Sequence, residues 1–118
     1  MKIPERFPDS ELVCKCGCGL LPDMRFVERL YAMRLILDIP LVVLSGARCP
    51  DYNIIVGGSE YSYHGVGAAD ILARHGWTRA DVIQAAIKVG MTGIGVNRGS
   101  IHVDDKHDRL TIWDYYKD

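Results

Sequence analysis

GIGVNRGSIHVD, residues 93–104, is the stretch of this chain that decides the predicted fold. Its two ends, 93–96 and 100–104, are short apolar runs, and the polar sequence between them is typical of a turn. Alternation along the second run places His102 and Asp104 on one face of a strand and apolar side chains on the other. We therefore expect two strands of a sheet, with the apolar face in the core and the His/Asp face turned toward a cleft.

Three further apolar runs, at 41–45, 68–72 and 110–113, predict strands, and a polar turn at 105–108 precedes the last of them. Residues 1–22 are expected to be irregular, because prolines and glycines interrupt them.

Two segments predict helices. Asp23 is placed to N-cap a helix over 24–38, in which apolar residues recur at helical spacing, and Pro40 ends it. Thr78 begins a second helix with an acidic residue three positions later, a capping-box arrangement, and Gly90 ends it. The order of helices and strands predicts one α+β domain over residues 1–118, with a small, mainly antiparallel sheet and helices packed on one side.

Composition limits the class of partner. The net charge of −1 and the lack of a basic block give no electrostatic case for binding nucleic acid or a membrane surface. No run approaches the length of a membrane span, and residues 1–8 lack the apolar stretch of a signal peptide. We expect a monomer that is synthesised in the cytoplasm and needs outside help for any export.

Four cysteines need an explanation. Cys14, Cys16 and Cys18 alternate in the segment CKCGCG, and Cys49 follows Arg48. The spacing differs from that of a zinc ribbon, and a second C-x-x-C pair is missing from the sequence. Reduced structural thiols, a disulfide and a second metal site all remain open.

Two histidines and one aspartate form a candidate metal site. His64 precedes a glycine-rich turn, Asp70 lies on the strand that leaves this turn, and His102 lies in the middle of a later strand. Three protein ligands leave the fourth tetrahedral position of Zn²⁺ to water, as hydrolytic zinc requires. The same residues also fit ordinary structural roles, such as a surface histidine and a hydrogen-bonded aspartate.

Several segments together resemble the M15 family of zinc D-Ala-D-Ala carboxypeptidases and murein endopeptidases, and within it the small branch often encoded by phages or prophages. The segments that carry the resemblance are 14–19, 45–53, 56–58, 62–71, 93–95 and 101–104. The resemblance implies the fold of hedgehog and DD-peptidase domains.

The resemblance also implies roles for single residues. His64, Asp70 and His102 would ligate Zn²⁺. Arg48 would bind the carboxylate of a peptidoglycan stem peptide, a role that suits the planar guanidinium fork. Ser62 would form hydrogen bonds near the site.

The general base is a point where this sequence departs from the family. Better-known members carry an acidic residue three positions before the last zinc histidine, where this chain has Gly99, and the separation between His64 and Asp70 is one residue shorter than in the family pattern. Asp104 is the nearest replacement, and we expect it to act as the base, with the orientation of a metal ligand as its other possible role. His107 is a further candidate for proton transfer, although its charged surroundings favour a solvated turn residue.

The sequence therefore predicts a zinc-dependent peptidase that hydrolyses bonds at D-amino acids in peptidoglycan stem peptides or cross-links. Such an enzyme would serve a bacteriophage as an endolysin or as a wall-cutting part of the particle. The alternative is a catalytically silent zinc-binding module that recognises cell-wall fragments or a protein partner. A third interpretation is a structural domain that holds metal through Cys14, Cys16 and Cys18.

Trp113 could form a wall of the cleft or belong to the core.

Overall fold

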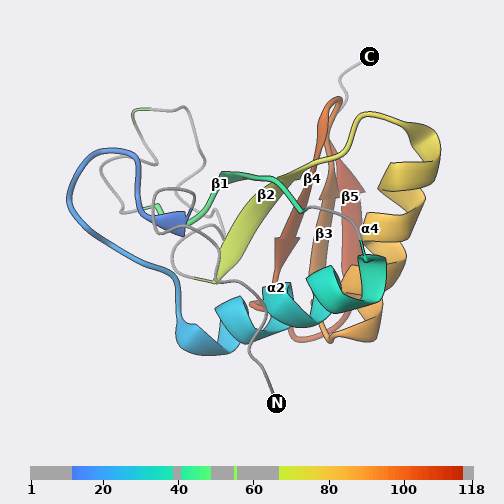
Figure 1. Ribbon diagram of the computed structural model, residues 1–118, viewed down its shortest axis with the longest axis horizontal. Helices are drawn as coiled ribbons and strands as arrows, with labels where there is room; N and C mark the ends of the chain where they lie inside the picture. The colour runs from blue at the N-terminus through green and yellow to red at the C-terminus, as the bar shows by residue number, and fades with distance from the viewer. Residues whose placement is uncertain (1–11, 39–40, 49–54, 56–66, 116–118) are drawn as a thin grey trace.

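The computed structural model describes residues 12–38, 41–48, 55 and 67–115, and Figure 1 shows their arrangement. The helices are α2 (Met24–Leu37) and α4 (Gly76–Lys88). The strands are β1 (Val43–Ser45), β2 (Ala68–Leu72), β3 (Gly93–Val96), β4 (Ser100–Asp104) and β5 (Thr111–Asp114).

The strands form one sheet in the order β1-β2-β4-β3-β5. β4 lies at its centre and pairs antiparallel with both β2 and β3, whereas β5 pairs parallel with β3 at the edge. Although β5 follows β4 in the chain, it cannot pair with β4, because β2 and β3 already occupy both of that strand's edges. The predicted α+β class with a mainly antiparallel sheet is confirmed.

One face of the sheet packs against both helices and forms the core. Alternate apolar residues of β4, Ile101 and Val103, are completely buried there. They belong to one apolar cluster with Phe26, Leu30 and Met33 of α2 and Val82, Ala85 and Ala86 of α4. Each large apolar side chain buried in this way contributes about 1.5–3 kcal/mol to stability. The helices therefore cover the apolar face, and the opposite face of the sheet carries the polar residues.

Helix α2 begins where the sequence predicts, with Asp23 as its N-cap residue, but the Asp23 side chain makes no capping hydrogen bond. The helix ends at Leu37, because Asp38 adopts a left-handed conformation with φ 51° and its backbone N–H bonds the Arg34 carbonyl. Pro40, the predicted terminator, lies outside the described residues.

Helix α4 starts at Gly76, two residues before the predicted Thr78, and His75 is its N-cap residue. The His75 carbonyl accepts a hydrogen bond from the Arg79 backbone N–H at 2.9 Å. The Arg79 guanidinium also donates to the carbonyls of Ala73 and Arg98, at 2.9 and 3.2 Å, and so ties the first turn of α4 to the loops beside β2 and β4. The bond to Arg98 joins segments that a capping box does not connect. Neither described helix is long and apolar enough to cross a bilayer.

Candidate active site

One residue from each strand contributes to a row that crosses the sheet. Ser45 of β1 pairs with Asp70 of β2, and Asp70 pairs with His102 of β4. His102 pairs in turn with Gly95 of β3, which lies beside Trp113 of β5. Directly paired residues in the regular β2–β4 and β3–β4 ladders share a face of the sheet, so the row brings together groups that are widely separated in the sequence. The register of β1 with β2 shifts between Val43 and Ser45.

His102 lies between two carboxylates at the centre of the row. Its Nε2 is 2.7 Å from Asp104 Oδ2, and its Nδ1 is 3.5 Å from Asp70 Oδ1. The side chain is buried, which by itself lowers the pKa of the imidazole. The hydrogen bonds and charges of Asp104 and Asp70 outweigh that effect and raise the pKa of His102 above its usual value.

Asp104 is completely buried and is bonded through both oxygens. Oδ2 contacts His102, while Oδ1 accepts the backbone N–H of Lys106 at 3.0 Å and lies 2.9 Å from His107 Nδ1. Burial raises the pKa of Asp104, but these hydrogen bonds outweigh it and the net direction is down. The carboxylate fits because Gly93 lies opposite it, where a Cβ would overlap the carboxylate atoms.

His107 is part of this network and not the solvated turn residue that the sequence favoured. Its side chain is 14% exposed, and its backbone N–H bonds the Thr92 hydroxyl at 3.0 Å. Asp104 thus connects two imidazoles, with His102 on one oxygen and His107 on the other. The sequence signal was a histidine three residues after a buried strand-end aspartate, which the polar turn around it obscured.

Aromatic rings close one side of the site. The Trp113 ring lies 5.3 Å from those of both His102 and His107, measured between centroids, and Tyr115 meets the Trp113 ring edge-on at 6.2 Å. Gly95 makes room for them, since a Cβ there would lie 2.8 Å from Trp113 Nε1 and from the Tyr115 ring. Trp113 therefore forms a wall beside the two histidines.

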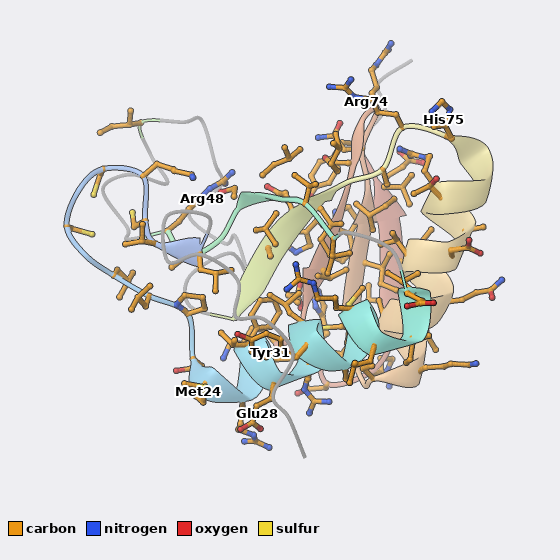
Figure 2. All side chains as sticks on the ribbon, in the orientation of Figure 1. Met24, Glu28, Tyr31, Arg48, Arg74 and His75 are labelled. Atoms are coloured by element: carbon orange, nitrogen blue, oxygen red, sulfur yellow. The ribbon has the colours of Figure 1, made fainter. Side chains whose placement is uncertain are left out.

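Arg48 approaches the row from the segment after β1. Its Nη2 lies 3.6 Å from Asp70 Oδ2, and the side chain is mostly buried. Figure 2 shows Arg48 near the β1 end of the sheet, well away from His75 at the start of α4. The predicted residues Arg48, Asp70, His102 and Asp104 are thus neighbours, whereas Ser62 and His64 lie outside the described residues.

The described donor atoms fit a zinc ion. Two ligand atoms at 2.0–2.1 Å from a tetrahedral Zn²⁺ are about 3.3–3.4 Å apart. The observed 3.5 Å between His102 Nδ1 and Asp70 Oδ1 is close to that separation. If Nδ1 held the ion, Nε2–H would donate to Asp104, and a carboxylate behind a ligating histidine is the usual arrangement at such sites.

Comparison with known proteins identifies the family. No curated protein matches this chain. The sequence profile of the family described as Peptidase M15 matches residues 5–104, which cover most of the chain and include the site from Arg48 to Asp104. His107 and Trp113 lie beyond the match. The match agrees with the segments that carry the resemblance in the sequence, and the chain belongs to the M15 family of peptidases.

Proposed function

We propose that this chain is a zinc-dependent peptidase that hydrolyses bonds at D-amino acids in bacterial peptidoglycan stem peptides or cross-links. The observation that carries the proposal is the direct pairing of Asp70 with His102, with Arg48 on one side and Asp104 on the other. Membership of a peptidase family supports the hydrolytic chemistry. The metal and the cell-wall substrate belong to the proposal.

Asp70 and His102 would hold the metal, with His64 as the third ligand that the family resemblance implies. When bound there, Zn²⁺ supplies a Lewis acid for the scissile carbonyl and lowers the pKa of a water ligand to about 7.

Asp104 orients His102 in this proposal. Of its two possible roles, general base and partner of a ligand, the contacts favour the second, because the carboxylate is fully buried and both oxygens accept hydrogen bonds. Its negative charge keeps a proton on His102 Nε2, so that Nδ1 would be the nitrogen that ligates a cation shared with Asp70.

His107 is the better-placed residue for moving a proton. Its Nδ1–H donates to Asp104 Oδ1, which leaves Nε2 as the nitrogen that exchanges a proton with water or with a leaving amine. Asp104 holds Nδ1 in place, and the Trp113 ring limits how the imidazole can turn. This assignment also explains how the chain would function with Gly99 at the position where better-known family members carry an acid.

Arg48 recognises substrate in the proposal. At 3.6 Å its Nη2 is beyond hydrogen-bonding distance of Asp70 Oδ2, although it is close enough to be held by that charge. A guanidinium so placed can bind the terminal carboxylate of a stem peptide through two parallel hydrogen bonds. In a phage setting the enzyme would reach its substrate after release from the cytoplasm or as part of the particle.

The test uses purified muropeptides: a stem peptide ending in D-Ala-D-Ala and a cross-linked dimer, each incubated with the full chain and Zn²⁺ and followed by mass spectrometry. We expect release of D-Ala or cleavage of the cross-link, and we expect this activity to be lost in His102→Ala and in the presence of a chelator. The matched control His75→Ala should keep the activity, because the His75 side chain is exposed at the start of α4. Absence of turnover on both substrates with zinc supplied would reject the enzyme and favour the silent wall-binding module.

A further inference from the structure

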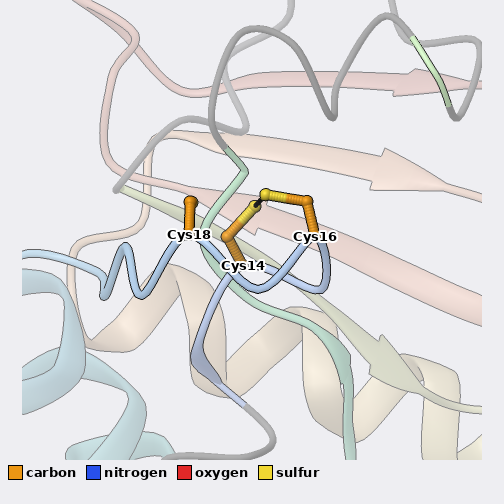
Figure 3. A group of neighbouring side chains, drawn as sticks. All are labelled: Cys14, Cys16 and Cys18. Carbon is orange, nitrogen blue, oxygen red and sulfur yellow. Dashed lines mark hydrogen bonds between the residues drawn. The ribbon is translucent and has the colours of Figure 1, made fainter.

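Three thiols gather in the loop before α2, and none of them belongs to the row of polar residues on the sheet. Figure 3 shows the side chains of Cys14, Cys16 and Cys18 rising from the same side of this loop. The Sγ atoms of Cys14 and Cys16 are 3.5 Å apart, and the three Sγ atoms all lie within 4.8 Å of one another. Among the described residues, this is the group of three or more potential metal ligands whose ligand atoms all lie close to one another.

The backbone draws these thiols together. An extended segment would separate Cys14 from Cys18 by about 13 Å. Instead the Cys14 backbone N–H bonds the Leu20 carbonyl at 2.8 Å and closes the loop. Gly17 and Gly19 adopt φ values of 89° and 84°, which residues other than glycine rarely adopt. Gly17 turns the chain between Cys16 and Cys18, and Gly19 turns it after Cys18.

The sulfur separation fits shared metal ligation. A disulfide needs an S–S distance of about 2.05 Å, and all three cysteines are thiols in the structure. Two thiolates at 2.3 Å from a tetrahedral Zn²⁺ are about 3.8 Å apart, close to the 3.5 Å between Cys14 and Cys16. Three soft sulfur ligands in one place select Zn²⁺ over Mg²⁺ or Ca²⁺.

Burial gives the cluster an inner and an outer side. Cys14 is 1% exposed, while Cys16 and Cys18 are exposed at the surface. A cation can therefore enter from solvent and be anchored to the interior through Cys14. Three thiolates and one Zn²⁺ carry a net charge of −1, and the same loop carries one positive residue, the exposed Lys15.

The loop is attached to the segment that carries Arg48. The Leu12 carbonyl, two residues before Cys14, accepts the Ala47 backbone N–H at 2.8 Å. Gly46 packs so closely on Leu12 that a Cβ would overlap the Leu12 backbone. Whatever stiffens the cysteine loop therefore also stiffens the backbone next to Arg48.

We propose that Cys14, Cys16 and Cys18 supply three of the four ligands of one Zn²⁺, separate from the ion expected at Asp70 and His102, and that this ion fixes the loop against the segment before Arg48. Binding of this ion does not depend on the proposed peptidase activity. The consequence for Arg48 rests on that function.

The test is Co²⁺ titration of the reduced, metal-free full chain in a Cys49→Ser background, where the three loop cysteines are the remaining thiols. We expect the thiolate-to-cobalt charge-transfer band in the near ultraviolet, displaced by Zn²⁺. The band should persist in His102→Ala, which removes a ligand of the other site, and Cys16→Ser and Cys18→Ser should each weaken binding at least tenfold. Both replaced cysteines are exposed, so these variants are expected to fold.

Elemental analysis gives an independent readout. The zinc content should fall by one ion per chain in Cys16→Ser, which loses the ion of the cysteine loop, and by one ion per chain in His102→Ala, which loses the ion of the other site. Matching thermal melts of Cys16→Ser and its parent in chelator show that lost binding is not misfolding. Absence of the charge-transfer band, or a zinc content that Cys16→Ser leaves unchanged, would overturn the proposal even if the peptidase assay succeeds. A peptidase assay that fails while the band is present would leave this site intact.

Discussion

Replacing Asp104 by Asn tests the network that connects the two histidines. The change preserves the shape of the side chain and removes its charge. Asp104 is completely buried and contacts His102, His107 and the Lys106 backbone N–H at 2.7, 2.9 and 3.0 Å. An asparagine oxygen can accept some of these bonds, but its NH₂ group must then face one of the donors.

The expected cost follows from these contacts. A hydrogen bond to a charged group contributes about 1.5–3 kcal/mol, and a buried donor left without a partner costs about 1–3 kcal/mol. We therefore expect Asp104→Asn to lower the free energy of unfolding of the metal-free protein by about 2–4 kcal/mol near pH 6. In the zinc-loaded protein, losing the partner of a ligating histidine typically lowers metal affinity 10–100-fold.

The pH dependence of that cost is the sharper test. The pKa of Asp104 is lowered in the folded protein, so its stabilisation is present above the unfolded value of about 3.9 and is lost as the pH falls through the folded value. The pKa of His102 is raised, so its stabilisation is present below about 6.5 and is lost as the pH rises through the folded value. The cost of Asp104→Asn should therefore be largest between about pH 4 and 6.5.

Urea denaturation of the metal-free wild type and variant from pH 3 to 9 measures this cost directly. Asp108→Asn is the matched control, because it changes an exposed aspartate in the following turn and should stay within about 0.5 kcal/mol of wild type. A cost that is independent of pH, or no larger than that of the control, would refute the proposed network.

Three further predictions concern other parts of the site. Gly95→Ala places a methyl group against the Trp113 ring, and it should lower the free energy of unfolding by about 1–3 kcal/mol and alter the near-ultraviolet circular dichroism. The control Gly99→Ala, with nothing within 4 Å of the new atom, should change neither the stability nor the spectrum, and equal melting temperatures for the two variants would contradict the packing. Arg48→Lys keeps the charge and loses the guanidinium fork, so KM for a stem peptide with a free terminal carboxylate should rise about tenfold, which corresponds to ~1.4 kcal/mol. KM for the amidated peptide should not change, and an equal rise for both peptides would argue against carboxylate binding. Zinc must displace a proton from His102, whose pKa is raised, so the zinc affinity should fall up to about tenfold per pH unit below that pKa. Competition with a chromophoric chelator measures this affinity, and a flat profile between pH 5 and 8 would exclude His102 as a ligand.

The local pattern of residues was sufficient for several elements. The strands predicted at 68–72, 93–96 and 100–104 have those bounds in the structure, because period-two alternation and turn residues act within a few positions. Helix α2 was predicted to within one residue at its end, because the helical spacing of its apolar residues is also a local property. The start of α4 was predicted two residues too late, and the bond from Arg79 to the Arg98 carbonyl near that start is a tertiary contact that local patterns do not contain.

By itself, the sequence determined the fold class, the family and the face of β4 that carries His102 and Asp104, because alternation and motif spacing are local properties. Tertiary structure alone decided which strands are neighbours. It placed Asp70 against His102, seated β5 beside β3, brought His107 onto Asp104 and closed the three thiols into one cluster. Each of these outcomes depends on which distant partner a strand or loop meets, and the alternation along one segment specifies a face without specifying the partner across it.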